Sequence, residues 1–156
     1  MGSGARRRLL STAPAIFAEI EALYAARKTE MEAHEISTGY LFTTMATNAI
    51  IIEPVFFWPT GWRPVHESAV EPAHLARLTQ RPENPAATAL VTELRKEVVA
   101  IFARYGSGHF HIGRTRPYRE SRDALTKSLL DAIKLVMDPH GIFNPGVLGF
   151  PPEPRP

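Results

Sequence analysis

Two apolar runs separated by a few residues constrain the fold of this chain more than any other feature. Residues 37–46 and 49–58 are rich in Thr, Ile, Val, Phe, Tyr and Met, and they are joined around Thr47-Asn48. These residue types favour β-strands, so the pattern predicts an antiparallel hairpin. Because proline cannot donate to a strand ladder, Pro54 predicts an edge position or a bulge in the second strand.

Both runs carry apolar residues at consecutive positions, as strands do when they are covered on two faces. The second cover could come from further strands of a longer chain or from a partner subunit. An open apolar edge also invites association, so a homo-oligomer is one expected outcome.

Three segments show the spacing of apolar residues that is typical of amphipathic helices, at residues 14–28, 86–104 and 122–137. Ser11 or Thr12 is the expected N-cap of the first helix, with Pro14 at an early helical position. The apolar positions are Ile16, Ile20, Leu23 and Tyr24 in the first segment, Leu90, Leu94, Val98, Ile101 and Phe102 in the second, and Leu125, Leu129, Ile133 and Val136 in the third.

Prolines divide the rest of the chain. Five of them fall within residues 59–85, which predicts a long connection with at most a short helix near residues 73–78. Gly106 and Gly108 stop the second long helix, residues 109–112 are strand-like, and the tail from residue 141 has no regular structure of its own. The order of elements predicts an α+β fold, an antiparallel sheet with helices packed on one face. We expect one domain over residues 13–150, flanked by flexible tails at 1–12 and 151–156.

Charge and composition narrow the function classes. The formal net charge of +2 in 156 residues gives no basic surface, which argues against nucleic acid as a partner. Cysteine is absent, so disulfides, thiolate metal sites and thiol nucleophiles are excluded. No apolar run approaches the ~20 residues of a spanning helix, so we expect no membrane insertion and take a cytoplasmic location as the default.

Residues 106–118 carry the most reactive side chains. His109 and His111 are two apart, so on a strand they point to one face and could address one ligand. Arg114 and Arg116 could then clamp a carboxylate as planar bidentate donors.

Each of these residues also has a structural interpretation. A His-x-His pair is often hydrogen-bonded without binding a ligand, loop arginines are usually solvated, and Tyr118 could donate a phenolic hydrogen bond or anchor the loop after Pro117. A metal would need His109 and His111 together with Glu53 or His34. That spacing is not diagnostic, and we predict no metal site.

The segment Asp138-Pro-His-Gly-Ile-Phe-Asn-Pro-Gly146 combines a helix stop with a tight Asn-Pro-Gly turn. Preceded by a helix with Ile133-Lys134, it resembles the C-terminal signature of FAD-linked oxidases in the vanillyl-alcohol oxidase and p-cresol methylhydroxylase superfamily. Residues 108–114 are similar to the His/Gly-rich strand and loop of that superfamily. The hairpin end at residues 52–59 looks like its substrate-side sheet, especially in FAD-linked lactate and hydroxy-acid dehydrogenases.

The resemblance implies a partial cap domain that covers the flavin and shapes the substrate pocket. It places His109 and His111 beside flavin and substrate as catalytic candidates, joined by Tyr118 from the reasoning above. Arg114, with Arg116, becomes the candidate partner of a substrate carboxylate. Asn144, Pro145 and Gly146 correspond to the turn that packs close to FAD.

Nothing in this chain resembles the N-terminal FAD-binding domain of that superfamily. We therefore expect an FAD-dependent oxidoreductase part that oxidises a CH–OH substrate, a hydroxy acid or a phenolic or other alcohol. It would be inactive without an FAD-binding domain supplied by a longer chain or a separate subunit. The alternatives are a stand-alone α+β module that binds a small ligand or a partner, and an inactive truncated gene product.

Overall fold

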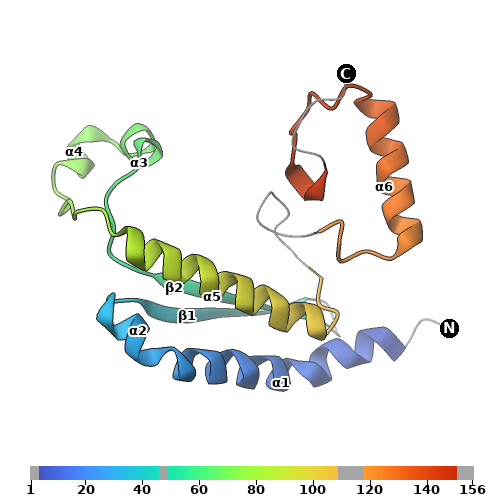
Figure 1. Ribbon diagram of the computed structural model, residues 1–156, viewed down its shortest axis with the longest axis horizontal. Helices are drawn as coiled ribbons and strands as arrows, with labels where there is room; N and C mark the ends of the chain where they lie inside the picture. Colours follow the sequence, from blue (N-terminus) through green and yellow to red (C-terminus); the bar gives the residue numbers. More distant parts are fainter. Residues whose placement is uncertain (1–3, 46–48, 109–117, 151–156) are drawn as a thin grey trace. The chain divides into compact units, whose positions relative to one another are not determined.

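A computed structural model describes residues 4–45, 49–108 and 118–150 of the chain (Figure 1). The chain divides into two compact units, Met1–Ile101 and Phe102–Pro156, which are described in turn. The elements are α1 (Gly4–Ala26), α2 (Lys28–Ala33), β1 (Ser37–Met45), β2 (Ala49–Phe57), α3 (Pro64–Ala69), α4 (Pro72–Leu75), α5 (Pro85–Arg104), α6 (Ala124–Met137) and the 3-10 helix η1 (Val147–Gly149). The α+β class is confirmed.

The predicted hairpin is confirmed. Strands β1 and β2 pair antiparallel in a continuous register, from Ser37 opposite Phe57 to Met45 opposite Ala49. Pro54 lies opposite Tyr40 without a bulge, in a sheet that has two strands among the described residues. Each strand therefore has an open edge, which is where a proline is tolerated. The predicted strand at residues 109–112 lies outside the described residues.

Aromatic side chains join α1 to one face of the hairpin. Tyr40 and Phe42 of β1 lie edge-on to Phe17, with ring centroids 5.1 and 5.7 Å away. Tyr24 meets Phe56 of β2 in a T-shaped contact at 5.5 Å. Edge-to-face pairs at these distances are favourable beyond the apolar area that they bury. Burial raises the pKa of Tyr24 to about 12, so its hydroxyl stays protonated at neutral pH.

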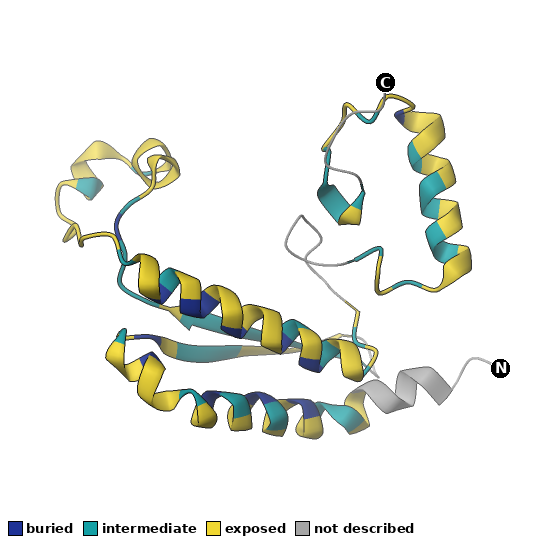
Figure 2. Cartoon of the chain, in the orientation of Figure 1, coloured by how far each residue is buried: buried dark blue, intermediate teal, exposed yellow. Residues whose placement is uncertain are grey.

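The core of the first unit is formed by the inward stripes of α1 and α5 (Figure 2). In α5 these are Ala87, Leu90, Val91, Leu94, Val98 and Ile101, which include four of the five residues expected there. Ile20 and Leu94 are fully buried. This stripe follows the period of 3.6 residues, so burial fixes how α5 is rotated about its axis.

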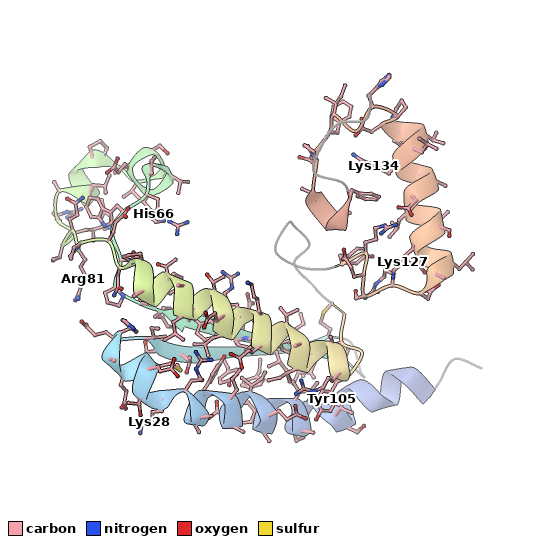
Figure 3. The ribbon with its side chains drawn as sticks, in the orientation of Figure 1. Lys28, His66, Arg81, Tyr105, Lys127 and Lys134 are labelled. Atoms are coloured by element: carbon pink, nitrogen blue, oxygen red, sulfur yellow. The ribbon has the colours of Figure 1, made fainter. Side chains whose placement is uncertain are left out.

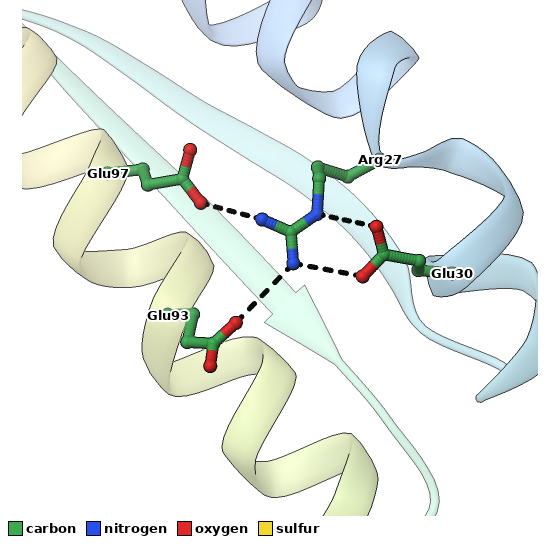
Figure 4. Close-up of polar contacts among 4 residues, drawn as sticks. All are labelled: Arg27, Glu30, Glu93 and Glu97. Carbon is green, nitrogen blue, oxygen red and sulfur yellow. Dashed lines mark hydrogen bonds and ion pairs between the residues drawn. The ribbon is translucent and has the colours of Figure 1, made fainter.

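A polar bridge ties the end of α1 to α5 (Figure 4). Arg27 donates from Nε and Nη2 to both carboxylate oxygens of Glu30, at 2.9 and 3.0 Å. It also reaches Glu97 at 2.9 Å and Glu93 at 3.4 Å. These contacts raise the pKa of Arg27, first through the hydrogen bond with Glu30. Because the carboxylates are exposed, solvent screens the bridge, and it orients the helices more than it stabilises them.

The expected start of the first helix is wrong. α1 begins at Gly4 and Pro14 lies inside it, so Ser11 and Thr12 are helical residues and not N-caps. Proline has no amide proton, so one helical hydrogen bond is missing at Pro14. The helix continues because good helix formers lie on both sides of it. The predicted end near residue 28 agrees with the end of α1 at Ala26, and an additional short helix, α2, follows after Arg27 and buries Met31.

The connection between β2 and α5 contains α4, near the expected short helix, and additionally α3. Proline stands in the first turn of α3, where its fixed φ favours a helix. His66 Nδ1 accepts a hydrogen bond from the Arg63 amide at 3.0 Å, which satisfies a donor that the helix leaves free. Among the described helices, none combines the length and hydrophobicity needed to cross a bilayer.

In the second unit, Gly106 ends α5 as expected. Its φ is 64°, and its amide donates to Ala103 O at 3.0 Å while that of Ser107 donates to Phe102 O at 3.1 Å. This is a Schellman motif, which satisfies the last carbonyls of the helix. The α6 residues Leu125 and Val136 are exposed in the described part of the chain. The domain boundaries at residues 13 and 150 stay a prediction.

Replacing Leu94 with Ala should lower the free energy of unfolding of the first unit by about 2–5 kcal/mol, because it leaves a cavity at a fully buried position. Urea unfolding followed by tryptophan fluorescence measures this, since both tryptophans, Trp58 and Trp62, lie in that unit. Val65→Ala is the matched control, because Val65 is 61% exposed and its change should stay within about 0.5 kcal/mol. Equal effects of the two substitutions would contradict the assigned core.

Candidate functional site

A buried carboxylate organises the segment after α6. Asp138 is 5% exposed and caps the C-terminus of the helix. Its Oδ2 accepts from Lys134 Nζ at 2.5 Å and from the Phe143 amide at 3.0 Å, and its Oδ1 accepts from the Ile142 amide at 2.9 Å. Lys134, labelled on α6 in Figure 3, also donates to Phe143 O at 2.7 Å. The signature segment is therefore fastened to the helix by charge-assisted hydrogen bonds.

The hydrogen bond from Lys134 holds the pKa of Asp138 below its usual range, and the amides of Ile142 and Phe143 act in the same direction against the effect of burial. Asp138 is thus ionised at neutral pH, and its negative charge is matched locally by one ammonium group. A carboxylate held in this way positions a loop and is not a general acid.

The expected tight turn at Asn144-Pro-Gly146 is confirmed. The Val147 amide donates to Asn144 O at 3.2 Å, and Gly146 has φ 77° and ψ −4°. These angles define a type II turn with Pro145 at its second position. Asn144 itself has φ 47°, a left-handed conformation that Asn tolerates better than most residues. The next residues form η1, one short turn in a tail that was expected to have no regular structure.

The segment carrying Tyr118 lies against η1. The Arg119 amide donates to Leu148 O at 3.2 Å, and the Arg119 side chain makes a bidentate pair with Asp131 of α6, at 2.9 and 2.6 Å. Tyr118 is half-buried, and the Arg122 guanidinium lies 4.9 Å from its ring centroid. The structure therefore brings Tyr118 into the same unit as the turn at residues 144–146.

The structure does not describe the other predicted site residues. His109, His111, Arg114 and Arg116 lie outside the described residues. Their grouping around one ligand, and their roles as base and carboxylate partner, stay predictions. No cluster of three or more metal-binding side chains occurs within residues 4–45, 49–108 and 118–150.

Sequence reasoning missed two ion pairs in the described part of this unit. Lys134 and Asp138 are four residues apart, which is the spacing of neighbours on one helix face, so a signal was present. The pairing of Arg119 with Asp131 spans a turn and left no such signal.

Residues 69–148, just over half of the chain, match the family of FAD linked oxidases, C-terminal domain. The chain belongs to this family. The match includes α5, α6 and the signature segment held by Asp138. No curated protein and no solved structure matches the chain.

Membership of the family of FAD-linked oxidase C-terminal domains implies FAD, whose pyrophosphate would suit a helix N-terminus with free amides. At α5, Asn84 Oδ1 already accepts from the Ala87 amide at 3.0 Å, and Pro85 has no amide proton. At α6, the Asp123 carboxylate accepts from the Thr126 amide at 3.0 Å and would repel a phosphate. Neither helix fits the pyrophosphate. In the turn at residues 144–146 Asn144 is exposed and Gly146 is half-buried, and the missing side chain of Gly146 suits a close backbone approach to a flat ring system.

Asp138→Asn should loosen the signature segment, because an amide side chain cannot match the Lys134 charge and presents one acceptor in place of two. In the native protein the folded-state pKa of Asp138 lies below its unfolded value, so its stabilisation is complete above about pH 4 and is lost as the pH falls further. Hydrogen exchange at the Ile142 and Phe143 amides should show this acid-dependent loss of protection. The variant should be poorly protected even at neutral pH.

Asp123→Asn is the control, because Asn also serves as an N-cap and should keep the α6 amides protected. Native protection at Ile142 and Phe143 in the Asp138 variant would contradict this account, because it would show that the Asp138 carboxylate does not hold the signature segment on α6.

Proposed function

We propose that this chain is the substrate- and flavin-covering part of an FAD-dependent oxidoreductase that oxidises a CH–OH group. It acts with an FAD-binding domain that is carried by a longer chain or by a separate subunit. The observation that carries the proposal is the family match over residues 69–148, which takes in the segment clamped by Asp138. The resemblance of the hairpin end to hydroxy-acid dehydrogenases favours a 2-hydroxy acid over a phenolic alcohol.

In this scheme FAD, when bound, accepts the hydride equivalent from the substrate carbon. The chain supplies the groups that bind and orient the substrate and take its proton. His109 or His111, as a neutral imidazole, accepts the hydroxyl proton at its unprotonated ring nitrogen. Arg114 and Arg116 hold the substrate carboxylate as bidentate donors. Tyr118 donates its phenolic hydrogen bond, and the turn at residues 144–146 covers the flavin.

The occupied N-termini of α5 and α6 support a division of labour. A domain that covers flavin without cradling its phosphates depends on another domain to bind FAD. The isolated chain should then have no oxidase activity of its own, although its folded units are present.

Domain complementation tests the proposal. An FAD-linked oxidase is truncated to its FAD-loaded N-terminal domain, mixed with this chain, and supplied anaerobically with 2-hydroxy acids and phenolic alcohols. We expect substrate-dependent bleaching of the flavin absorbance only when both polypeptides are present. If the enzyme's own C-terminal domain restores bleaching and this chain restores none with any substrate, the proposal is wrong.

His109→Gln and His111→Gln separate the two candidate bases. Loss of the base should slow flavin bleaching by about 10²–10⁴-fold, while the other histidine should have a smaller effect. His74→Gln is the matched control, because His74 lies exposed on α4 and has no assigned role. Native bleaching rates in both single variants and in the double variant would show that neither histidine is the base.

A further inference from the structure

The first unit contains a hollow of about 600 Å³ between the end of β2, the α3 segment and α5. A second hollow of about 540 Å³ adjoins it and shares Arg63 and Thr88 in its lining. A volume of this size suits a small organic ligand. The lining residues all belong to the unit Met1–Ile101.

One wall of the larger hollow is aromatic. It consists of Phe56 and Trp58 at the end of β2, which are two residues apart and so share one face of the strand. Trp58 Nε1 donates to Thr88 Oγ1 at 3.2 Å, and that hydroxyl donates to Asn84 O at 3.0 Å, so the indole ring is held in one orientation. Phe57 points to the opposite face of the strand, where its ring lies against Gly39, and its ring is not part of this wall.

The charged residues that line this hollow are all basic. They are Arg63 and Arg95 of α5. His66 of α3 (labelled in Figure 3) also lines the hollow and accepts a hydrogen bond at Nδ1, and no carboxylate lines it, whereas Glu83 and Glu93 line the adjoining hollow. Arg95 shares a helix face with Thr88, because the two are seven residues apart. Its rotation toward the hollow is thus set by the buried stripe of α5.

Arg63 and Arg95 also lack the carboxylate partners that other arginines in this chain have. Arg27, Arg81 and Arg119 each pair with at least one acid. Among the described residues, neither Arg63 nor Arg95 takes part in an ion pair. Two guanidinium groups without carboxylate partners, beside an aromatic wall, form a site for an anion that carries a ring.

We propose that this hollow binds an aromatic carboxylate. The ring packs on Trp58, and the carboxylate accepts from Arg63 and Arg95, whose planar donors suit it. The site requires neither flavin nor turnover, so its test is independent of the oxidoreductase proposal.

Calorimetric titration of the purified chain with 2-naphthoate and with its neutral analogue 2-naphthamide tests the site. We expect saturable binding of the acid, and binding of the amide that is at least about tenfold weaker, because one charge-assisted contact is worth about this factor or more. Arg63→Gln and Arg95→Gln should each weaken 2-naphthoate by about tenfold.

Arg77→Gln is the matched control. Arg77 donates to Ala73 O on the neighbouring helix segment and does not line the hollow, so its variant should bind 2-naphthoate as the native chain does. The substituted side chains are exposed, and melting curves of the variants should match that of the native chain. Equal affinities for acid and amide, native affinity in the Arg95 variant, or no saturable binding of 2-naphthoate would each overturn the proposal.

Discussion

A two-stranded hairpin is at best marginally stable in water, and this constraint decides the architecture of the first unit. Its paired backbone becomes stable only when one face is covered, and α1 and α5 supply that cover through Ile20 and Leu94. The same burial rotates α5, so that Thr88 and Arg95 face the hollow beside Trp58. The proposed ligand site is thus a consequence of core packing.

The second unit depends on polar contacts to a much greater degree. Asp138 is the one buried residue in the described part of this unit. Its carboxylate accepts hydrogen bonds from Lys134 and from the amides of Ile142 and Phe143. The bidentate pair of Arg119 with Asp131 adds a second bridge to α6. Such contacts specify geometry well and contribute little apolar burial.

Much of the fold follows from the sequence, because it rests on periodicity. The hairpin, the α5 stripe, the stop at Gly106 and the turn at residues 144–146 each express a local rule of side-chain burial or backbone angle. The start of α1 did not follow, since proline inside a helix is tolerated when its neighbours are good helix formers. α3 was missed because a six-residue helix depends on its caps more than on its own apolar pattern.

The candidate site is less predictable than the fold. Tyr118 and the 144–146 turn are brought into one unit by contacts between Arg119, Leu148 and Asp131, which are distant in sequence and leave no periodic signal. His109, His111, Arg114 and Arg116 were chosen for their chemistry and spacing, and they lie outside the described residues. The family match raises the case for the oxidoreductase lineage without assigning a role to any one of them.

The claim that this chain covers a flavin held by another domain can be measured directly by flavin fluorescence. Increasing amounts of the chain are added to free FAD and, in parallel, to an FAD-loaded N-terminal domain of an FAD-linked oxidase. The account predicts a saturable change with the FAD-loaded domain and none with free FAD. Saturable binding of free FAD, or an unchanged signal from the FAD-loaded domain, would contradict it.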